Sequence, residues 1–186
     1  MIKPKGSTGG NRGHLVFVKF ADSITVTVGE VVSRYTGDAN ECTNVTTAAQ
    51  PILGVINNLC DSSGNPLFSS TITAGTAKSS VITSQATGTT DATYGYIEAS
   101  TSVKFSAEVQ GTLGTTNASD FAGARLDTNS AGADYDELLE TSATRTIGTP
   151  AQWYSHGIDP SGPSQALATA NLLVSIAMSE LDSVME

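Results

Sequence analysis

Apolar and polar residues alternate along the first part of the chain in the way that is typical of β-strands. Residues 14–20 (HLVFVKF) have this character, and within residues 23–32 (SITVTVGEVV) the apolar Ile24, Val26 and Val28 alternate with threonines. A period of two residues places such side chains on one face of a half-buried strand. The Gly-Glu pair that follows is expected to form the turn before the next strand.

A run of small polar residues, 46–50, leads to Pro51 and then to the apolar residues 52–56 (ILGVI). Proline has no N–H to give to a sheet, so it belongs at the start of a strand or at an edge. We interpret residues 52–56 as a strand that is buried on both faces and is bounded by Asn57. Gly54 in its middle predicts a β-bulge or the close approach of another backbone.

Further strands are expected at short β-branched runs that are separated by turn residues. Two of them are residues 94–99 (YGYIEA) and 102–113 (SVKFSAEVQGTL). Residues 70–75 and 79–85 predict two shorter strands around a turn. In residues 171–181 (NLLVSIAMSEL), the apolar positions alternate, which favours a strand over a helix.

These elements predict a mainly β protein. We expect a compact antiparallel β-barrel or sandwich with long loops, at most one or two short helices, and an extended N-terminal arm. The arm comprises residues 1–13, which contain a proline and four glycines and show no periodicity, and is expected to be flexible and basic. Residues 14–186 are expected to form a single β-rich domain.

Within that domain, residues 115–150 are small, polar and acidic, and we interpret them as an irregular segment. Ser119-Asp120 and residues 134–140 (DYDELLE) are the two places where a short helical turn is expected. Long irregular segments in a compact domain are usually functional or exposed. The acidic residues of this segment cluster at Asp134, Asp136, Glu137 and Glu140.

The formal net charge is −9, but it is unevenly distributed. Residues 1–19 contain four basic residues and no acidic ones, whereas the rest of the chain contains all 18 acids. A basic arm on an acidic body predicts contact with an acidic protein surface, with a frayed, solvated terminus as the alternative. Because an acidic body repels phosphates, no nucleic-acid partner is expected. No apolar run approaches the roughly 20 residues of a membrane helix, so no membrane partner is expected either.

The residue types offer little that supports catalysis, and we expect no enzymatic activity. The two histidines are His14 and His156. Ser155 next to His156 is expected to point to the opposite face of a strand, so the two side chains do not form a nucleophile–base pair. His156 is instead expected to be a packed or hydrogen-bonded residue near Trp153. The aromatic content of 6% leaves few rings to stack a sugar, which argues against a glycosidase.

The sequence also shows no pattern for a metal or a cofactor, and we expect neither. The cysteines Cys42 and Cys60 have no zinc-site spacing. Since no export signal is visible, we expect them to be reduced and buried, with a disulfide between them as the alternative. The acidic cluster of residues 134–140 lacks the spacing of a calcium loop, and the glycine-rich start of the chain lacks a phosphate-binding motif.

Several stretches, taken in order, resemble one known family. They are SITVTVGEVV, TTAAQPILGVINN and YGYIEASTSVKFSAEVQG, followed by the acidic segment and the closing strand NLLVSIAM. Over roughly residues 20–180 this order is similar to that of the capsid decoration (head cement) proteins of tailed bacteriophages. The resemblance implies a virion structural protein, made in the host cytoplasm, that binds the outer surface of an icosahedral capsid. It implies the major capsid protein as partner, association into a homo-oligomer, and no catalytic residues.

The alternative is another β-rich assembly module, such as a phage tail or fibre component or a cell-surface adhesive protein. An adhesive protein usually shows exposed aromatic or metal sites and a fibre shows repeats, and neither is visible in the sequence. The candidate contacts with the capsid or with another copy are Lys3, Lys5, Arg12, Asp134, Asp136, Glu137 and Glu140.

Overall fold

In the computed structural model, every regular element of the described residues is a strand, which confirms the predicted mainly β fold. The described residues are 2–7, 14–45, 50–67, 71–74, 94–109, 122–126, 128, 137–138, 152–164 and 170–177. Their strands form a closed barrel, an open sheet and a two-stranded ribbon. The predicted strand at residues 79–85 lies outside the described part of the chain.

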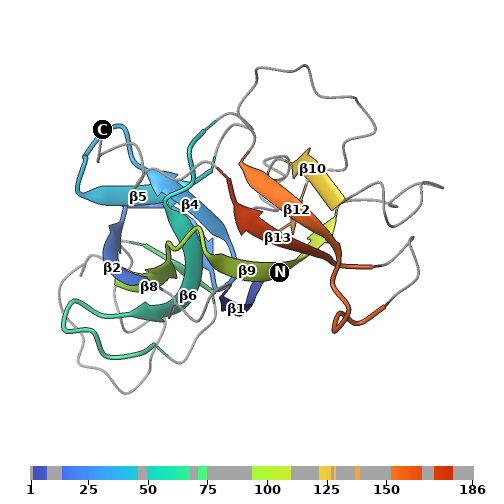
Figure 1. The fold of residues 1–186 in the computed structure, drawn as a ribbon. Coiled ribbons are helices and arrows are strands. Elements are labelled where there is room, and N and C mark those ends of the chain that lie inside the picture. Colours follow the sequence, from blue (N-terminus) through green and yellow to red (C-terminus); the bar gives the residue numbers. More distant parts are fainter. Residues whose placement is uncertain are drawn as a thin grey trace.

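Five strands form the closed barrel, on the left in Figure 1. Around the barrel they follow the order β2 (Leu15–Phe20), β5 (Glu41–Asn44), β4 (Val31–Arg34), β6 (Gly54–Cys60) and β8 (Tyr94–Glu98). All neighbours are antiparallel except β2 and β5, which run parallel and pair only at Lys19 with Glu41 and at Phe20 with Cys42. Within the barrel, the expected antiparallel arrangement therefore holds except at this junction.

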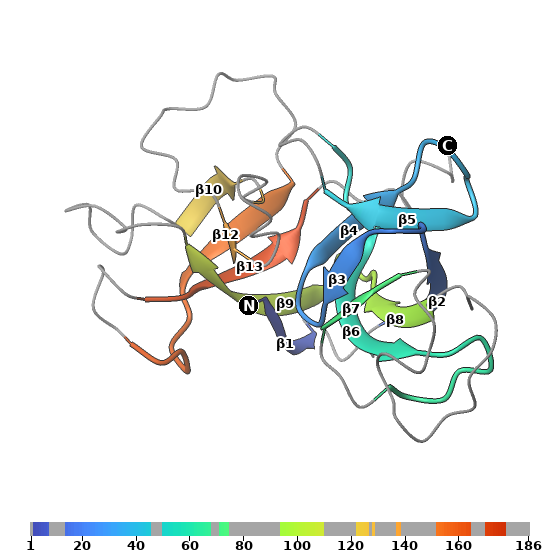
Figure 2. The ribbon, with the colours of Figure 1, turned by 180° about the vertical axis from the view of Figure 1, so that it is seen from behind.

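The open sheet lies on the right in Figure 1. Its strands follow the order β1 (Lys3–Ser7), β9 (Val103–Val109), β13 (Leu172–Ile176), β12 (Trp153–Ile158) and β10 (Ala122–Leu126), all antiparallel to their neighbours. The short β11 (Glu137–Leu138) pairs parallel with β9. The two-stranded ribbon consists of β3 (Thr25–Thr27) and β7 (Thr71–Thr73) and is visible beside the barrel in Figure 2. The predicted closing strand is confirmed, since β13 alternates buried and half-buried residues.

The first residues of the N-terminal arm form a strand, which the sequence did not predict. Residues 3–7 form β1 and pair with β9, from Lys3 opposite Ser106 to Ser7 opposite Val103. Ile2 is buried, with 1% of its surface exposed. The buried Ile2 side chain and the backbone pairing with β9 hold this segment in place. Neither contact can be predicted from the charge of the segment. Residues 8–13 lie outside the described residues.

The apolar run after Pro51 is buried as predicted. Its buried side chains are Ile52, Leu53, Val55 and Ile56. Gly54 marks a close approach of two backbones, because a Cβ there would lie 2.8 Å from the carbonyl oxygen of Glu98. The strand differs from the prediction in three ways. It begins at Gly54 rather than at Ile52. It continues past Asn57 to Cys60, and its irregular register lies between Ile56 and Asn58.

A cluster of buried side chains joins the barrel to the sheet. Its barrel members come from β4, from β6 and from the segments beside them: Val31, Val45, Ile52 and Val55. Its sheet members include Trp153, which is fully buried and meets the ring of Phe105 edge-on at 5.7 Å between ring centroids. A second cluster fills the barrel and reaches the ribbon, with Phe20, Ile56, Leu59 and Ile97 among its members.

A buried polar contact also links the two parts. Gln152 is fully buried just before β12, and its side-chain oxygen accepts a 2.7 Å hydrogen bond from the N–H of Thr128. Its side-chain nitrogen donates at 2.6 Å to the carbonyl of Gln50. The Gln50 amide in turn donates to the hydroxyl of Ser33 on β4. A side chain of the sheet therefore satisfies backbone groups on both sides of the junction.

The acidic segment contains more strand than predicted. Residues 122–126 form β10 at the edge of the sheet, and Glu137–Leu138 form β11. The helical turn expected within residues 134–140 is therefore wrong at its centre, where pairing with β9 determines the backbone instead. The other expected turn, at Ser119-Asp120, lies outside the described residues.

Candidate functional site

The outer surface of the barrel carries an apolar row on β2 and β8. Along β2, Leu15 and Phe17 face outward, and antiparallel pairing places Phe17 opposite Tyr96. The ring of Phe17 stacks on that of Tyr94, with centroids 5.1 Å apart and planes at 8°, and meets Tyr96 at 5.2 Å and 57°. We call Leu15, Phe17, Tyr94 and Tyr96 the aromatic row.

Two members of the aromatic row are exposed, which makes the row a candidate binding surface. Leu15 is 49% exposed and Phe17 is 42% exposed, whereas apolar side chains on the inner face of β2 pack toward the barrel core. Contiguous exposed apolar surface on a soluble protein marks interaction sites. The sequence analysis missed this surface. Its signal was present, because residues 15 and 17 and residues 94 and 96 each have the spacing of two residues that places side chains on one strand face.

A cavity of about 370 Å³ lies beside the aromatic row, between β2 and the start of β5. We call it the barrel cavity. Its lining mixes apolar, aromatic and charged side chains: Phe17, Val18, Lys19, Arg34, Ala39, Asn40, Glu41, Cys42, Leu53 and Tyr94. Its volume falls in the range of small-molecule sites, about 300–1,000 Å³.

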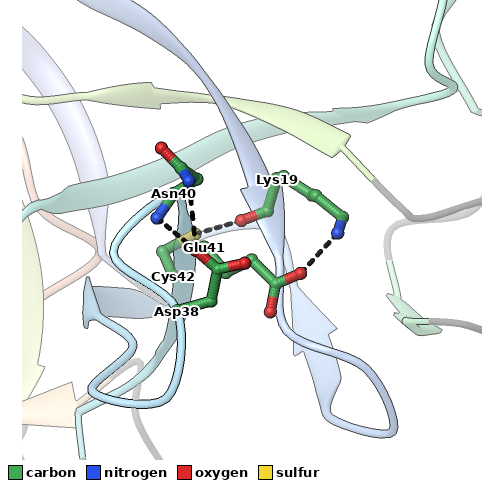
Figure 3. A network of polar contacts seen from close by, with 5 residues as sticks. All are labelled: Lys19, Asp38, Asn40, Glu41 and Cys42. Atoms are coloured by element: carbon green, nitrogen blue, oxygen red, sulfur yellow. Dashed lines mark hydrogen bonds and ion pairs between the residues drawn. The ribbon is translucent and has the colours of Figure 1, made fainter.

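Polar contacts hold the rim of the barrel cavity, as Figure 3 shows. The Lys19 ammonium forms an ion pair with the Glu41 carboxylate, and this hydrogen bond raises the pKa of Lys19 above its ordinary value. A carboxylate oxygen of Asp38 accepts hydrogen bonds from the backbone N–H of Asn40 at 2.9 Å and from its side-chain amide at 3.1 Å. The Cys42 thiol donates to the carbonyl of Lys19 at 3.3 Å. The start of β5 is thereby held against β2, and the loop before it is closed on itself by Asp38.

The basic candidates of the N-terminus lie at the edge of the sheet. Lys3 and Lys5 are residues of β1, and Lys104 on the adjacent β9 pairs with Gly6. We call Lys3, Lys5 and Lys104 the basic border. The edge is a β-strand rather than a loose arm, so these positions are fixed along the backbone. Arg12, the third predicted basic contact, lies outside the described residues.

The acidic candidates are only partly placed. Glu137 lies on β11 and pairs in register with Glu108 of β9, at the opposite end of that strand from Lys104. Asp134, Asp136 and Glu140 lie outside the described residues, so their role as contacts stays a prediction.

His156 is exposed on β12, whereas Ser155 is fully buried on the other face. The argument against a Ser155–His156 pair is therefore confirmed. The imidazole Nε2 shares a 3.0 Å hydrogen bond with the hydroxyl of Ser175, and Tyr154 lies edge-on at 5.1 Å. The prediction that His156 lies near Trp153 is wrong, because the Trp153 ring lies on the buried face of β12. Partial burial of the ring, and to a smaller extent the Lys104 charge, lower the pKa of His156.

No catalytic or metal centre is found in the part of the chain that the structure describes. No carboxylate there hydrogen-bonds His156, so a triad is not assembled around it. No three His, Cys, Asp or Glu residues of that part gather closely enough to hold a metal ion. Both cysteines are buried, as predicted, and are not disulfide-bonded, and burial together with Asp61 raises the pKa of Cys60 to about 11.

Comparisons with known proteins do not assign this chain to a family. No family model, curated protein or solved structure matches the chain. Among the described residues, no helix is long and apolar enough to span a membrane.

Proposed function

We propose that this chain is a virion structural protein that binds the outer surface of a tailed-phage capsid and stabilises it. The resemblance to capsid decoration proteins supports the proposal, because it falls on segments that build the core. Val55 from the PILGV stretch, Phe105 from VKFSAEV and Val174 from NLLVSIAM all belong to the buried cluster at the junction of barrel and sheet. The resemblance thus concerns the scaffold of the protein.

The observation that carries the proposal is the basic border on an acidic protein. Lys3 and Lys5 lie on an edge strand next to Lys104, although the net charge of the chain is −9. Complementary charge steers two proteins together and fixes their register. In this proposal the basic border faces acidic residues of the major capsid protein.

The rigidity of a β scaffold suits a protein that clamps a shell. Binding loses less free energy to ordering when the contact surface is already fixed. Association of several copies around one position on the shell would add avidity, since each further contact becomes intramolecular. Homo-oligomer formation is therefore part of the proposal.

Cosedimentation with purified capsids tests the proposal. Wild-type protein is mixed with expanded, mature heads and with unexpanded heads, and the bound fraction is measured over a range of salt concentrations. We expect saturable binding to expanded heads that weakens as salt screens the charges. Absence of binding to either kind of head would refute the capsid role.

Two double variants test the basic border, and each removes two positive charges. Lys3→Gln with Lys5→Gln is expected to weaken capsid binding about 2- to 10-fold, the effect of two exposed ion pairs. Lys19→Gln with Arg34→Gln, on the barrel, serves as the matched control and is expected to leave binding unchanged. Equal weakening by both variants would indicate a general charge effect and would contradict the assignment of the border.

The second candidate function is a cell-surface adhesive module, and the aromatic row favours it. Leu15 and Phe17 supply the exposed apolar surface that such a protein requires and that was not visible in the sequence. Binding of the purified protein to host cells in the absence of capsids, lost in Phe17→Ala, would support this candidate.

A further inference from the structure

The barrel cavity has two chemically different sides. From β2 and β8 come the rings of Phe17 and Tyr94, and from β4, β5 and the loop between them come Arg34, Asn40 and Glu41. The first group offers flat apolar surface, and the second offers a guanidinium, an amide and a carboxylate. A ligand that fits must be apolar on one face and rich in hydrogen-bonding groups around its edge.

A sugar ring has this combination of properties. Its C–H groups form an apolar face that covers an aromatic ring, and its hydroxyls both donate and accept hydrogen bonds, as amide, carboxylate and guanidinium groups require. The volume of about 370 Å³ has room for one or two sugar rings. We propose that the barrel cavity and the adjoining aromatic row form a carbohydrate-binding site. This inference does not depend on the capsid role.

The site is held in place before any ligand arrives. Phe17 is fixed by rings on two sides, since it contacts both Tyr94 and Tyr96. Asn40 is held by the two hydrogen bonds to Asp38, and Glu41 by the ion pair with Lys19. Prior fixation lowers the entropy that binding must otherwise lose, which matters for a small, weakly held ligand.

The lining favours binding of a sugar over its hydrolysis. Glycoside hydrolysis uses two carboxyl groups that flank the bond to be cleaved. Among the described residues, the cavity lining contains one carboxyl group, that of Glu41, and it is already paired with Lys19.

Saturation-transfer difference NMR tests the inference on the full chain. The probes are the methyl α- and β-glycosides of glucose, galactose, mannose and N-acetylglucosamine, each present in large excess. We expect ring-proton signals from at least one of them, strongest on the face that covers the aromatic rings. If none of the eight glycosides gives a signal, the inference is overturned.

Two matched variants locate the site. Phe17→Ala removes an exposed ring that lines the cavity and is expected to weaken the responding glycoside about 2- to 12-fold. Tyr35→Ala removes an exposed ring that does not line it and is expected to change affinity less than twofold. Because both residues are exposed, 42% and 38%, neither variant is expected to unfold the protein, and circular dichroism verifies this.

A second variant probes the polar side. Asn40→Ala is expected to weaken the same glycoside while leaving the aromatic row intact. Binding that survives both Phe17→Ala and Asn40→Ala at full strength would place the sugar elsewhere and overturn the inference. Capsid cosedimentation of Phe17→Ala separates the two proposals, since the capsid role by way of the basic border predicts unchanged binding.

Discussion

The barrel and the sheet bury their apolar residues in different ways. The barrel closes on itself and encloses its own cluster around Phe20, Ile56 and Ile97. The sheet is open, and the cluster on its buried face is completed by barrel residues such as Ile52 and Val55. The barrel therefore carries its own core, whereas the sheet depends on the barrel for part of its core. Loss of packing at the junction is expected to affect the sheet more.

A turn closed by an aspartate side chain occurs in both the barrel and the sheet. The two turns differ in whether their backbone bonds are local or reach a distant segment. Asp61 follows β6 and Asp159 follows β12, and each side chain accepts a hydrogen bond from the N–H two residues later, at 2.8 and 3.0 Å. The N–H of Asp61 bonds to Asn65 within its own loop, while that of Asp159 bonds to Asn171, close to β13. The barrel turn is closed locally, and the sheet turn is fastened by a distant segment.

Replacement of Trp153 is expected to have the largest effect on this comparison. Trp153→Ala removes a fully buried ring together with its edge-on contact with Phe105 and its 2.9 Å hydrogen bond to Thr128. The free energy of unfolding is expected to fall by about 3–5 kcal/mol. Urea denaturation followed by far-UV circular dichroism measures it.

Amide hydrogen exchange of the same variant tests whether the two parts differ. Protection is expected to fall further in β12 and β13 than in β6 and β8, because the sheet is the dependent part. Tyr154→Ala, on the opposite face of β12, is the control and is expected to cost about 1 kcal/mol or less. An equal loss of protection in all four strands would show that the barrel and the sheet unfold as one unit.

The polar link at the junction is expected to have the next largest effect. Gln152→Ala leaves the N–H of Thr128 and the carbonyl of Gln50 without their partner in a buried place. An unsatisfied buried group costs about 1–3 kcal/mol, so a loss of about 2–3 kcal/mol is expected. Gln50→Ala is the matched control. It removes the side-chain bond to Ser33 and keeps the backbone carbonyl that Gln152 binds. A cost as large as that of Gln152→Ala would contradict a bridging role.

A change inside the barrel is expected to have a smaller but specific cost. In Gly95→Ala, the new Cβ would lie 2.7 Å from the carbonyl oxygen of Asn58 and 2.9 Å from the ring of Phe20. Overpacking of this kind costs about 1–3 kcal/mol. Gly37→Ala is the control, because the three atoms nearest to its Cβ all belong to the exposed side chain of Tyr35, which can move away. Equal stability of the two variants, measured by thermal unfolding, would contradict the close fit of the barrel core.

Local patterns in the sequence predicted the strands well. The alternation at residues 171–181 and the apolar run at 52–56 led directly to β13 and to the start of β6, because side-chain period and burial are properties of the segment itself. The N-terminal strand was missed because β1 is stabilised by pairing with β9, about a hundred residues away. Contacts at such separation leave no local periodicity.

The site was harder to predict than the fold for the same reason. The aromatic row arises when Phe17 is brought beside Tyr94 and Tyr96 by strand pairing. The aromatic content shows that aromatic residues are few, but it does not show that three of them lie together on one face of the barrel. The barrel cavity likewise lies where β2 and β5 run parallel over two residue pairs, and no pattern in either segment indicates this pairing. The basic candidates Lys3 and Lys5 were identified from charge, but their place on a sheet edge was not.

The smallest effect concerns the electrostatics of the sheet. His156 has a pKa below its ordinary value, first because of burial and second because of the Lys104 charge. The Lys104→Gln variant is expected to raise this pKa only part of the way back, since the effect of burial remains. Proton NMR titration of the imidazole measures the shift, and Lys19→Gln on the barrel is the control that should leave it unchanged.

The sign of the corresponding stability effect follows from linkage. A histidine whose pKa is lowered on folding favours the native state while it is neutral, so its contribution is lost as pH falls below the unfolded value of about 6.5. Lys104→Gln should reduce that loss. If the variant leaves the pKa of His156 unchanged, the charge of Lys104 does not reach the outer face of β12, and the positive potential of the basic border is confined to the edge formed by β1.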